Sequence, residues 1–206
     1  IKNLADGSIT TVTTDGEKNK IINGVPDWVY QEEFGILNSL KWSPSSNTLA
    51  FIRFDESQVP MYSMTMYEGD CHPNKDYSLY PGSYDYKYPV AGEKNSVVSV
   101  MAYDLATSRL QKMNLPITDN DYVPHIDYGT QDDRLMVSTL NRTQNDLHIY
   151  AVNPATTQAT EVYAEQSTSW IDSKSANDVM YYDTFFVMPS EKSGYMHLYQ
   201  YAYDGK

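Results

Sequence analysis

The sequence predicts an all-β chain, and within that class a β-propeller fragment. Its 206 residues include 19 Tyr, 5 Phe and 3 Trp, and Thr, Val and Ile are scattered in short runs; these residue types suit strands. Most apolar runs end at a turn signal such as Asp-Gly or Asn-Pro, and no long helical periodicity is present. A hairpin pattern also recurs at a spacing of roughly 50 residues, which is typical of propeller blades.

Two kinds of strand pair build the predicted blades. The outer pair of a blade is a strand, a polar turn and a second strand, and it recurs at residues 1–12, 98–110, 147–157 and 197–206. The inner pair is an aromatic residue, a polar turn and an apolar strand, and it occurs at residues 40–53 and 126–138. We therefore expect a partial propeller over residues 1–206, with about two complete four-stranded blades and partial blades at both ends.

The first two outer hairpins are farther apart than the blade period, and two segments fill the excess. One is a linker around residues 24–34, and the other is an inserted arm at residues 59–94. The arm carries many Tyr and Met side chains, which are enriched in interface cores: Met61, Tyr62, Met64, Met66, Tyr67, Tyr77, Tyr80, Tyr84, Tyr86 and Tyr88. Two interpretations stay open, an arm that packs on a partner subunit and an arm that folds back on its own propeller.

Composition excludes several classes of protein. Asp plus Glu is 27 against 15 Lys plus Arg, so the formal net charge of −12 would repel nucleic acid and an anionic bilayer. No run approaches the roughly 20 apolar residues of a membrane-spanning helix. The single Cys71 excludes an internal disulfide, and its neighbours Asp70, His72 and Asp76 fit no zinc pattern. No phosphate-binding glycine loop is present either. From these two observations we expect no metal and no cofactor.

The segment 26–34 holds the candidate binding residues. Asp27 can cap a short helix that begins at Trp28. On a helical turn Glu32 and Glu33 diverge by only about 100°, so both can face one cation, and a bound ammonium would relieve their mutual repulsion. The alternative is an acidic turn that only faces water.

The other polar candidates have simpler explanations. His125, His148 and His197 lie in strand patterns and are expected to be strand residues. Asn141 begins a glycosylation triplet that is common by chance. No Gly-Xaa-Ser-Xaa-Gly elbow is present, so the sequence predicts no bond-breaking site in this chain.

Several segments, in order and along nearly the whole chain, resemble one family, the N-terminal propeller of dipeptidyl peptidase IV. The resemblance rests on DWVYQEE at 27–33, WSP at 42–44, LAF at 49–51, FDESQVP at 54–60, YPVAGEKN at 88–95, LNRTQN at 140–145 and SEKSGYMHLY at 190–199.

That resemblance implies an N-terminal propeller that covers an α/β-hydrolase domain in a serine peptidase, which releases Xaa-Pro or Xaa-Ala dipeptides from peptides with a free N-terminus. In the family the last two acids of the DWVY motif bind the substrate's α-amino group, which would be Glu32 and Glu33 here; Gln31 stands where many members have a third acid. The resemblance also implies a homodimer formed through the arm, a bacterial source and a periplasmic or secreted location.

The resemblance further implies what lies outside the chain. The catalytic serine, aspartate and histidine would follow Lys206, and a substrate-contacting arginine would precede Ile1. We therefore expect the chain by itself to be inactive. Two other functions stay open: a non-catalytic TolB-like propeller whose arm binds a protein partner, and a sugar-binding β-domain.

Overall fold

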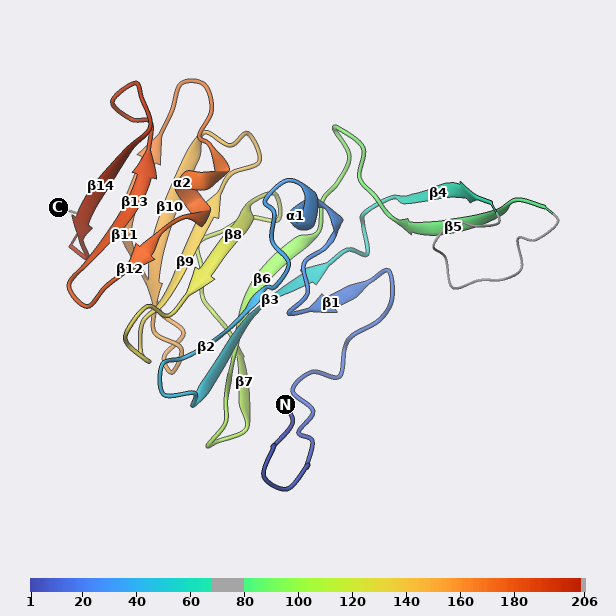
Figure 1. Ribbon diagram of the computed structural model, residues 1–206, viewed down its shortest axis with the longest axis horizontal. Coiled ribbons are helices and arrows are strands. Elements are labelled where there is room, and N and C mark those ends of the chain that lie inside the picture. Colours follow the sequence, from blue (N-terminus) through green and yellow to red (C-terminus); the bar gives the residue numbers. More distant parts are fainter. Residues whose placement is uncertain (68–79, 205–206) are drawn as a thin grey trace.

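A computed structural model describes residues 1–67 and 80–204, and in these residues the chain is almost entirely β-structure (Figure 1). Its larger sheets are antiparallel meanders that follow one another along the chain, as successive propeller blades do. The all-β propeller fragment predicted from the sequence is confirmed.

The first blade pairs its strands in the order β2, β3, β6, β7, and an extra short strand, β1, pairs with β3. These strands are β1 (Ile21–Asn23), β2 (Leu40–Trp42), β3 (Thr48–Asp55), β6 (Val97–Asp104) and β7 (Arg109–Lys112). Both β1 and β2 lie along the same edge of β3, with Asn23 opposite Arg53 and Leu40 opposite Phe51. The edge strand of this blade is therefore split into two pieces, and the residues between the pieces leave the sheet.

The second blade is complete, and the third is described over three strands. The second consists of β8 (Tyr122–Asp127), β9 (Leu135–Leu140), β10 (Asp146–Val152) and β11 (Ala159–Gln166). The third consists of β12 (Met180–Tyr181), β13 (Phe185–Ser190) and β14 (His197–Ala202), and the short helix α2 (Ser173–Asn177) precedes it. The outer hairpins expected at 98–110 and 147–157 and the inner pairs expected at 40–53 and 126–138 all form.

The core fills the space between adjacent blades. Every residue of β9 is buried, because a neighbouring blade covers each face of the second sheet. Phe54 of the first blade and Phe186 of the third are both fully buried in the same apolar cluster. Lys41 of β2 also pairs with Asp127 of β8 at 3.2 Å, so the inner strands of the first two blades are joined by an ion pair. Blade-to-blade packing therefore sets the place of the loops described below.

The two ends of the chain form less than the sequence predicts. In the expected hairpin at 1–12 the structure has an isolated bridge between Lys2 and Ile9, with hydrogen bonds across the Asp-Gly turn, but no extended strands. A hairpin without a sheet beside it buries too little surface to be stable alone. At the other end β14 forms, and the residues after Asp204 lie outside the described part.

The inserted arm is a two-stranded hairpin that projects away from the blades (Figure 1). Its strands are β4 (Met61–Met66) and β5 (Gly82–Lys87), paired in register from Met61 opposite Lys87 to Met66 opposite Gly82. Residues of both strands are mostly exposed, including Tyr62 and Met64. In the described residues, strands β4 and β5 thus extend from the connection between β3 and β6 and do not fold back on the blades.

Gly129, in the turn after β8, lies at a close approach between the second and third blades. Its φ is +60°, and a Cβ atom added there would lie 2.8 Å from the Cβ of Tyr181 in β12. Because the Cβ of Tyr181 is fixed to the strand backbone, the methyl group of a Gly129→Ala variant must push the two blades apart. The alanine would also have to adopt a left-handed backbone conformation. We expect the variant to lose about 2–4 kcal/mol of unfolding free energy.

The matched control for this prediction is Gly35→Ala. Gly35 has a similar φ of +65° but nothing within 4 Å of the added Cβ. This control should lose only the roughly 1 kcal/mol that the left-handed backbone costs a residue with a side chain. Equal losses for the two variants in urea unfolding would show that the contact with Tyr181 has no effect.

Candidate functional site

The residues that leave the split edge strand form a closed loop, residues 24–39, which we call the acidic loop. Its two ends meet: Gly24 N–H donates to the carbonyl of Ile52 at 2.9 Å, and Ile52 N–H donates to the carbonyl of Ser39 at 2.9 Å. Ser39 N–H then donates to the carbonyl of Gly24 at 3.2 Å. Loops whose ends lie close together and whose own side chains fill them are compact units. The segment around 24–34 is therefore a folded loop and not the linker that the sequence suggested.

Gly24 is required where the acidic loop begins. Its φ is +74°, and an added Cβ would lie 3.4 Å from Leu40 Cδ2. A residue with a side chain would be strained there because of the positive φ.

The helix α1 (Trp28–Glu32) is capped by Asp27, as the sequence predicts. The Oδ1 atom of Asp27 accepts a hydrogen bond from Tyr30 N–H at 3.0 Å, which is the usual N-cap geometry. Glu33 follows as the C-cap, with a helical backbone whose N–H donates to the carbonyl of Val29 at 2.8 Å. Glu32 and Glu33 therefore lie together on the last helical turn, where the sequence placed them.

Tyr30 anchors α1 in the core. Its side chain is 1% exposed, and its ring contacts Phe34, Phe54 and Tyr122 at centroid distances of 4.9–6.1 Å. Its hydroxyl oxygen accepts a hydrogen bond from Val123 N–H at 2.9 Å, and burial raises the Tyr30 pKa well above its usual value. The helix is thus fixed to the second blade as well as to the first.

The far end of the acidic loop touches the third blade. Asn177, at the end of α2, donates from Nδ2 to the carbonyl of Phe34 at 3.0 Å. This bond joins residues far apart in the sequence, so the acidic loop bridges blades one, two and three. A loop held at so many points presents its exposed residues in a fixed position.

Glu32 and Glu33 are both exposed on this fixed loop. Among residues 1–67 and 80–204, no ion pair or side-chain hydrogen bond engages either of them. They also stand at the C-terminal end of a helix that has no basic residue in its last turn, where the carbonyl dipoles disfavour negative charge. Two acids in an unfavourable place on a rigid loop form a site suited to a cation.

Gln31 does not take part in the acidic face. Its Nε2 atom donates to the carbonyl of Pro26 at 2.7 Å, which closes the start of the loop. A carboxylate at this position has no proton to donate and could not make that bond. The glutamine therefore has a structural role that an acid could not fill.

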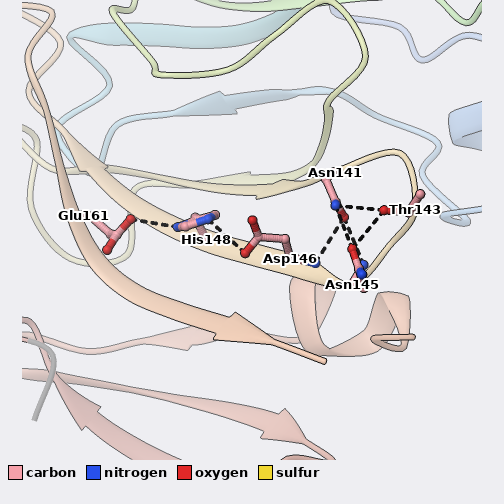
Figure 2. Close-up of polar contacts among 6 residues, drawn as sticks. All are labelled: Asn141, Thr143, Asn145, Asp146, His148 and Glu161. Carbon is pink, nitrogen blue, oxygen red and sulfur yellow. Dashed lines mark hydrogen bonds and ion pairs between the residues drawn. The ribbon is translucent and has the colours of Figure 1, made fainter. Parts of the chain in front are cut away.

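The remaining polar candidates are structural (Figure 2). The Oδ1 atom of Asn141 accepts from the backbone N–H groups of Asn145 and Asp146, and its Nδ2 donates to Thr143 and Asn145, so the triplet organises the β9–β10 turn. His148 lies between two carboxylates, with Nε2 3.2 Å from Asp146 and Nδ1 2.7 Å from Glu161. These carboxylates sit on opposite sides of the ring and cannot share one metal ion.

The other two histidines are strand residues as well, His125 in β8 and His197 in β14. Burial lowers the His125 pKa, which keeps the ring neutral. The described residues contain no group of three or more metal-ligating side chains, and the cluster around Cys71 lies outside them. In the part of the chain that the structure describes, no helix has the length and apolar character needed to span a bilayer.

A family profile described as the dipeptidyl peptidase IV (DPP IV) N-terminal region matches residues 1–206. The chain belongs to this family. Dipeptidyl peptidase 4 of Trichophyton equinum is 31% identical over 206 residues, which cover 95% of this chain and 26% of that protein. The dipeptidyl peptidase 4 of Trichophyton rubrum is also 31% identical, over 97% of this chain and 26% of the relative.

Solved structures agree with this assignment. The crystal structure of Porphyromonas gingivalis dipeptidyl peptidase 4 matches with a TM-score of 0.91 and 40% identity, over 99% of this chain and 28% of that one. A putative dipeptidyl aminopeptidase IV from Bacteroides ovatus matches with a TM-score of 0.78 and 27% identity, over 94% of this chain and 26% of that one. The DPP IV region described here therefore spans about a quarter of the length of its relatives.

Sequence reasoning found the acidic pair and its capping residue but missed the contacts that hold the loop. Neither the closure at Gly24, Ser39 and Ile52 nor the contact from α2 has a local signal, because the partners are distant in sequence. The helix α2 itself was missed, although Asp172 caps it by accepting from Lys174 N–H at 2.9 Å. An Asp followed by Ser-Lys-Ser-Ala is a capping signal that could have found it.

Proposed function

We propose that this chain is the substrate-recognition and gating propeller of a DPP IV-like aminodipeptidase, and that Glu32 and Glu33 anchor the substrate's α-amino group. One observation carries the proposal: a loop closed at its base and fixed to three blades presents two exposed carboxylates that lack a cationic partner among the described residues. An ammonium group supplies three donors and a positive charge, which matches such a pair.

An amine anchor at a fixed distance from a nucleophile determines how many residues lie between the N-terminus of the peptide and the bond that is cleaved. With the amine bound to the acidic pair, only a dipeptide fits between the anchor and the bond to be cleaved. An acylated amine would leave both carboxylates without their partner, at a cost of roughly 1–3 kcal/mol per lost charged contact. The proposed substrates are peptides with a free N-terminus and Pro or Ala in second place.

The full-length protein would carry the rest of the machinery. We infer a C-terminal α/β-hydrolase domain with a catalytic serine, a homodimer that uses the arm, a bacterial source and a periplasmic or secreted location. Support for the peptidase comes from the family and from the names of the relatives, which are dipeptidyl peptidases. The bacterial source is proposed from the similar structures of Porphyromonas gingivalis and Bacteroides ovatus, whereas the curated relatives named above are fungal. No cofactor is proposed, and the chain by itself should be inactive.

The test is hydrolysis of Gly-Pro-arylamide by the full-length protein, beside the same substrate with an acetylated amine. We expect rapid cleavage of the free-amine substrate and at least a 100-fold lower kcat/KM for the acetylated one, since two charged contacts are lost. An active-site serine inhibitor should abolish the activity, and the isolated chain should give no turnover. A full-length protein that cleaves neither substrate would instead fit a non-catalytic, TolB-like propeller.

A further inference from the structure

The chain that returns from the arm, residues 88–96, packs against the start of α1; we call it the return segment. At its beginning, the ring of Tyr88 lies 4.1 Å from that of Trp28, the first residue of α1. At its end, Ser96 Oγ donates to Oδ2 of Asp27 at 2.6 Å. The return segment leads from β5 of the arm to β6 of the first blade (Figure 1). One short piece of chain therefore holds both the cap and the first residue of the helix.

The hydrogen bond between Ser96 and Asp27 is buried and supplies a partner for the second oxygen of the Asp27 carboxylate. Asp27 is 6% exposed and Ser96 is 4% exposed. The two carboxylate oxygens of Asp27 accept different hydrogen bonds: Oδ1 accepts from Tyr30 N–H inside the helix, and Oδ2 accepts from Ser96 Oγ–H outside it. Without the serine hydroxyl, Oδ2 would be a buried charged atom with no partner, which costs more than the loss of an average hydrogen bond.

Among residues 1–67 and 80–204, Ser96 is the only side chain that donates a hydrogen bond to Asp27. Glu56 is also buried, at 6% exposure, and burial together with the nearby charge of Asp27 raises the pKa of Glu56. Burial likewise raises the pKa of Asp27, and the Ser96 hydrogen bond is the foremost contact that opposes this. If the bond is lost, we expect Asp27 to turn away from its capping position toward water.

We propose that Ser96 and Tyr88 are positioning residues for the amine anchor: Ser96 fixes Asp27, Tyr88 fixes Trp28, and together they set the place of Glu32 and Glu33. This inference rests on the proposed function. The helix is only five residues long, and the acidic pair lies about 7 Å along the axis from its first residue. A displacement of the first turn should therefore displace Glu32 and Glu33 by a similar amount. Neither residue touches the substrate, and both act through the helix.

The proposal is tested by kinetics of the full-length protein with Gly-Pro-arylamide. We expect Ser96→Ala and Tyr88→Ala each to raise KM by about fivefold to 20-fold and to leave kcat within twofold, because the anchor is displaced while the nucleophile is untouched. Ser96→Thr keeps the hydroxyl and Tyr88→Phe keeps the ring, so both should restore KM to within twofold of wild type.

Ser190→Ala is the matched control. Ser190 is also fully buried, and its hydroxyl donates to the carboxylate of Glu165 at 2.8 Å, but it lies on β13, outside the acidic loop and the return segment. It should lower the melting temperature and leave KM unchanged. A purely structural role of Ser96 would give the same result as Ser190.

The outcomes separate this inference from the function on which it rests. If Glu33→Gln raises KM while Ser96→Ala and Tyr88→Ala do not, the positioning role is wrong and the anchor stands. If Glu33→Gln also leaves KM unchanged, the amine anchor itself is wrong. Should Ser96→Ala fail to fold, Tyr88→Ala beside Tyr88→Phe decides the question, since Tyr88 is only half-buried.

Discussion

A Glu32→Gln/Glu33→Gln double variant of the full-length protein should cleave Gly-Pro-arylamide with kcat/KM lowered by roughly 100-fold or more. Glutamine keeps the shape of each side chain but removes its charge, and a hydrogen bond to a charged group contributes about 1.5–3 kcal/mol. Since 1.36 kcal/mol corresponds to a tenfold change in rate, two such contacts account for the expected loss. The measurement is steady-state kinetics at a fixed pH.

The sharpest form of this experiment combines the variant with acetylation of the substrate amine. Both changes remove the same interaction, so their effects should not add: the double variant should discriminate weakly between free and acetylated substrate. A Glu17→Gln/Asp133→Asn variant is the control, because it removes two exposed carboxylates outside the acidic loop. Full discrimination in the Glu32/Glu33 variant would show that the amine binds elsewhere.

The candidate site could be predicted from the sequence because its key features are local. An N-cap aspartate acts within one helical turn, and two adjacent glutamates on that turn diverge by only about 100°, so both can face one cation. The blades could also be predicted from the sequence, because their hairpins repeat a short pattern of apolar strand and polar turn. These features depend on neighbours in the sequence.

The supports of the site could not be predicted in this way. The hydrogen bond from Ser96 to Asp27 joins residues 69 positions apart, and nothing in either local sequence indicates the other. The bond from Asn177 to Phe34 spans 143 positions. For the same reason a segment that looked like a linker is in fact a closed loop, since its closure depends on Ile52 of β3. Long-range contacts decide whether two exposed acids are a solvated turn or a fixed anchor.

The arm supports the second prediction of large effect, that its removal converts a dimer of the full-length protein to a monomer. Met61, Tyr62 and Met64 of β4 are 48%, 45% and 44% exposed, and Tyr84 of β5 is 39% exposed, so large apolar side chains lie in water on a hairpin that projects from the blades. A two-stranded hairpin is marginal by itself. Tyr and Met are enriched at the centres of interfaces, and a second copy of this chain is the proposed partner.

The deletion can be made without disturbing the acidic loop. Met61 and Lys87 are opposite each other in the β4–β5 ladder, so residues 62–86 can be replaced by an Asn-Gly turn that joins them. The shortened chain keeps the bond from Lys87 Nζ to the carbonyl of Val59 at 2.7 Å, and it keeps Tyr88 against Trp28. Light scattering should then report half the mass of the wild-type protein at micromolar concentration, since loss of a few buried aromatic anchors costs roughly 2 kcal/mol or more each.

A Tyr62→Ser/Met64→Ser variant is the complementary test, because it retains the hairpin and removes two of its exposed apolar side chains. It should weaken the dimer in the same direction and by less than the deletion. A deletion variant that keeps the mass of a dimer would place the subunit interface on other surfaces. In that case we would expect the exposed tyrosines of the arm to contact a different protein.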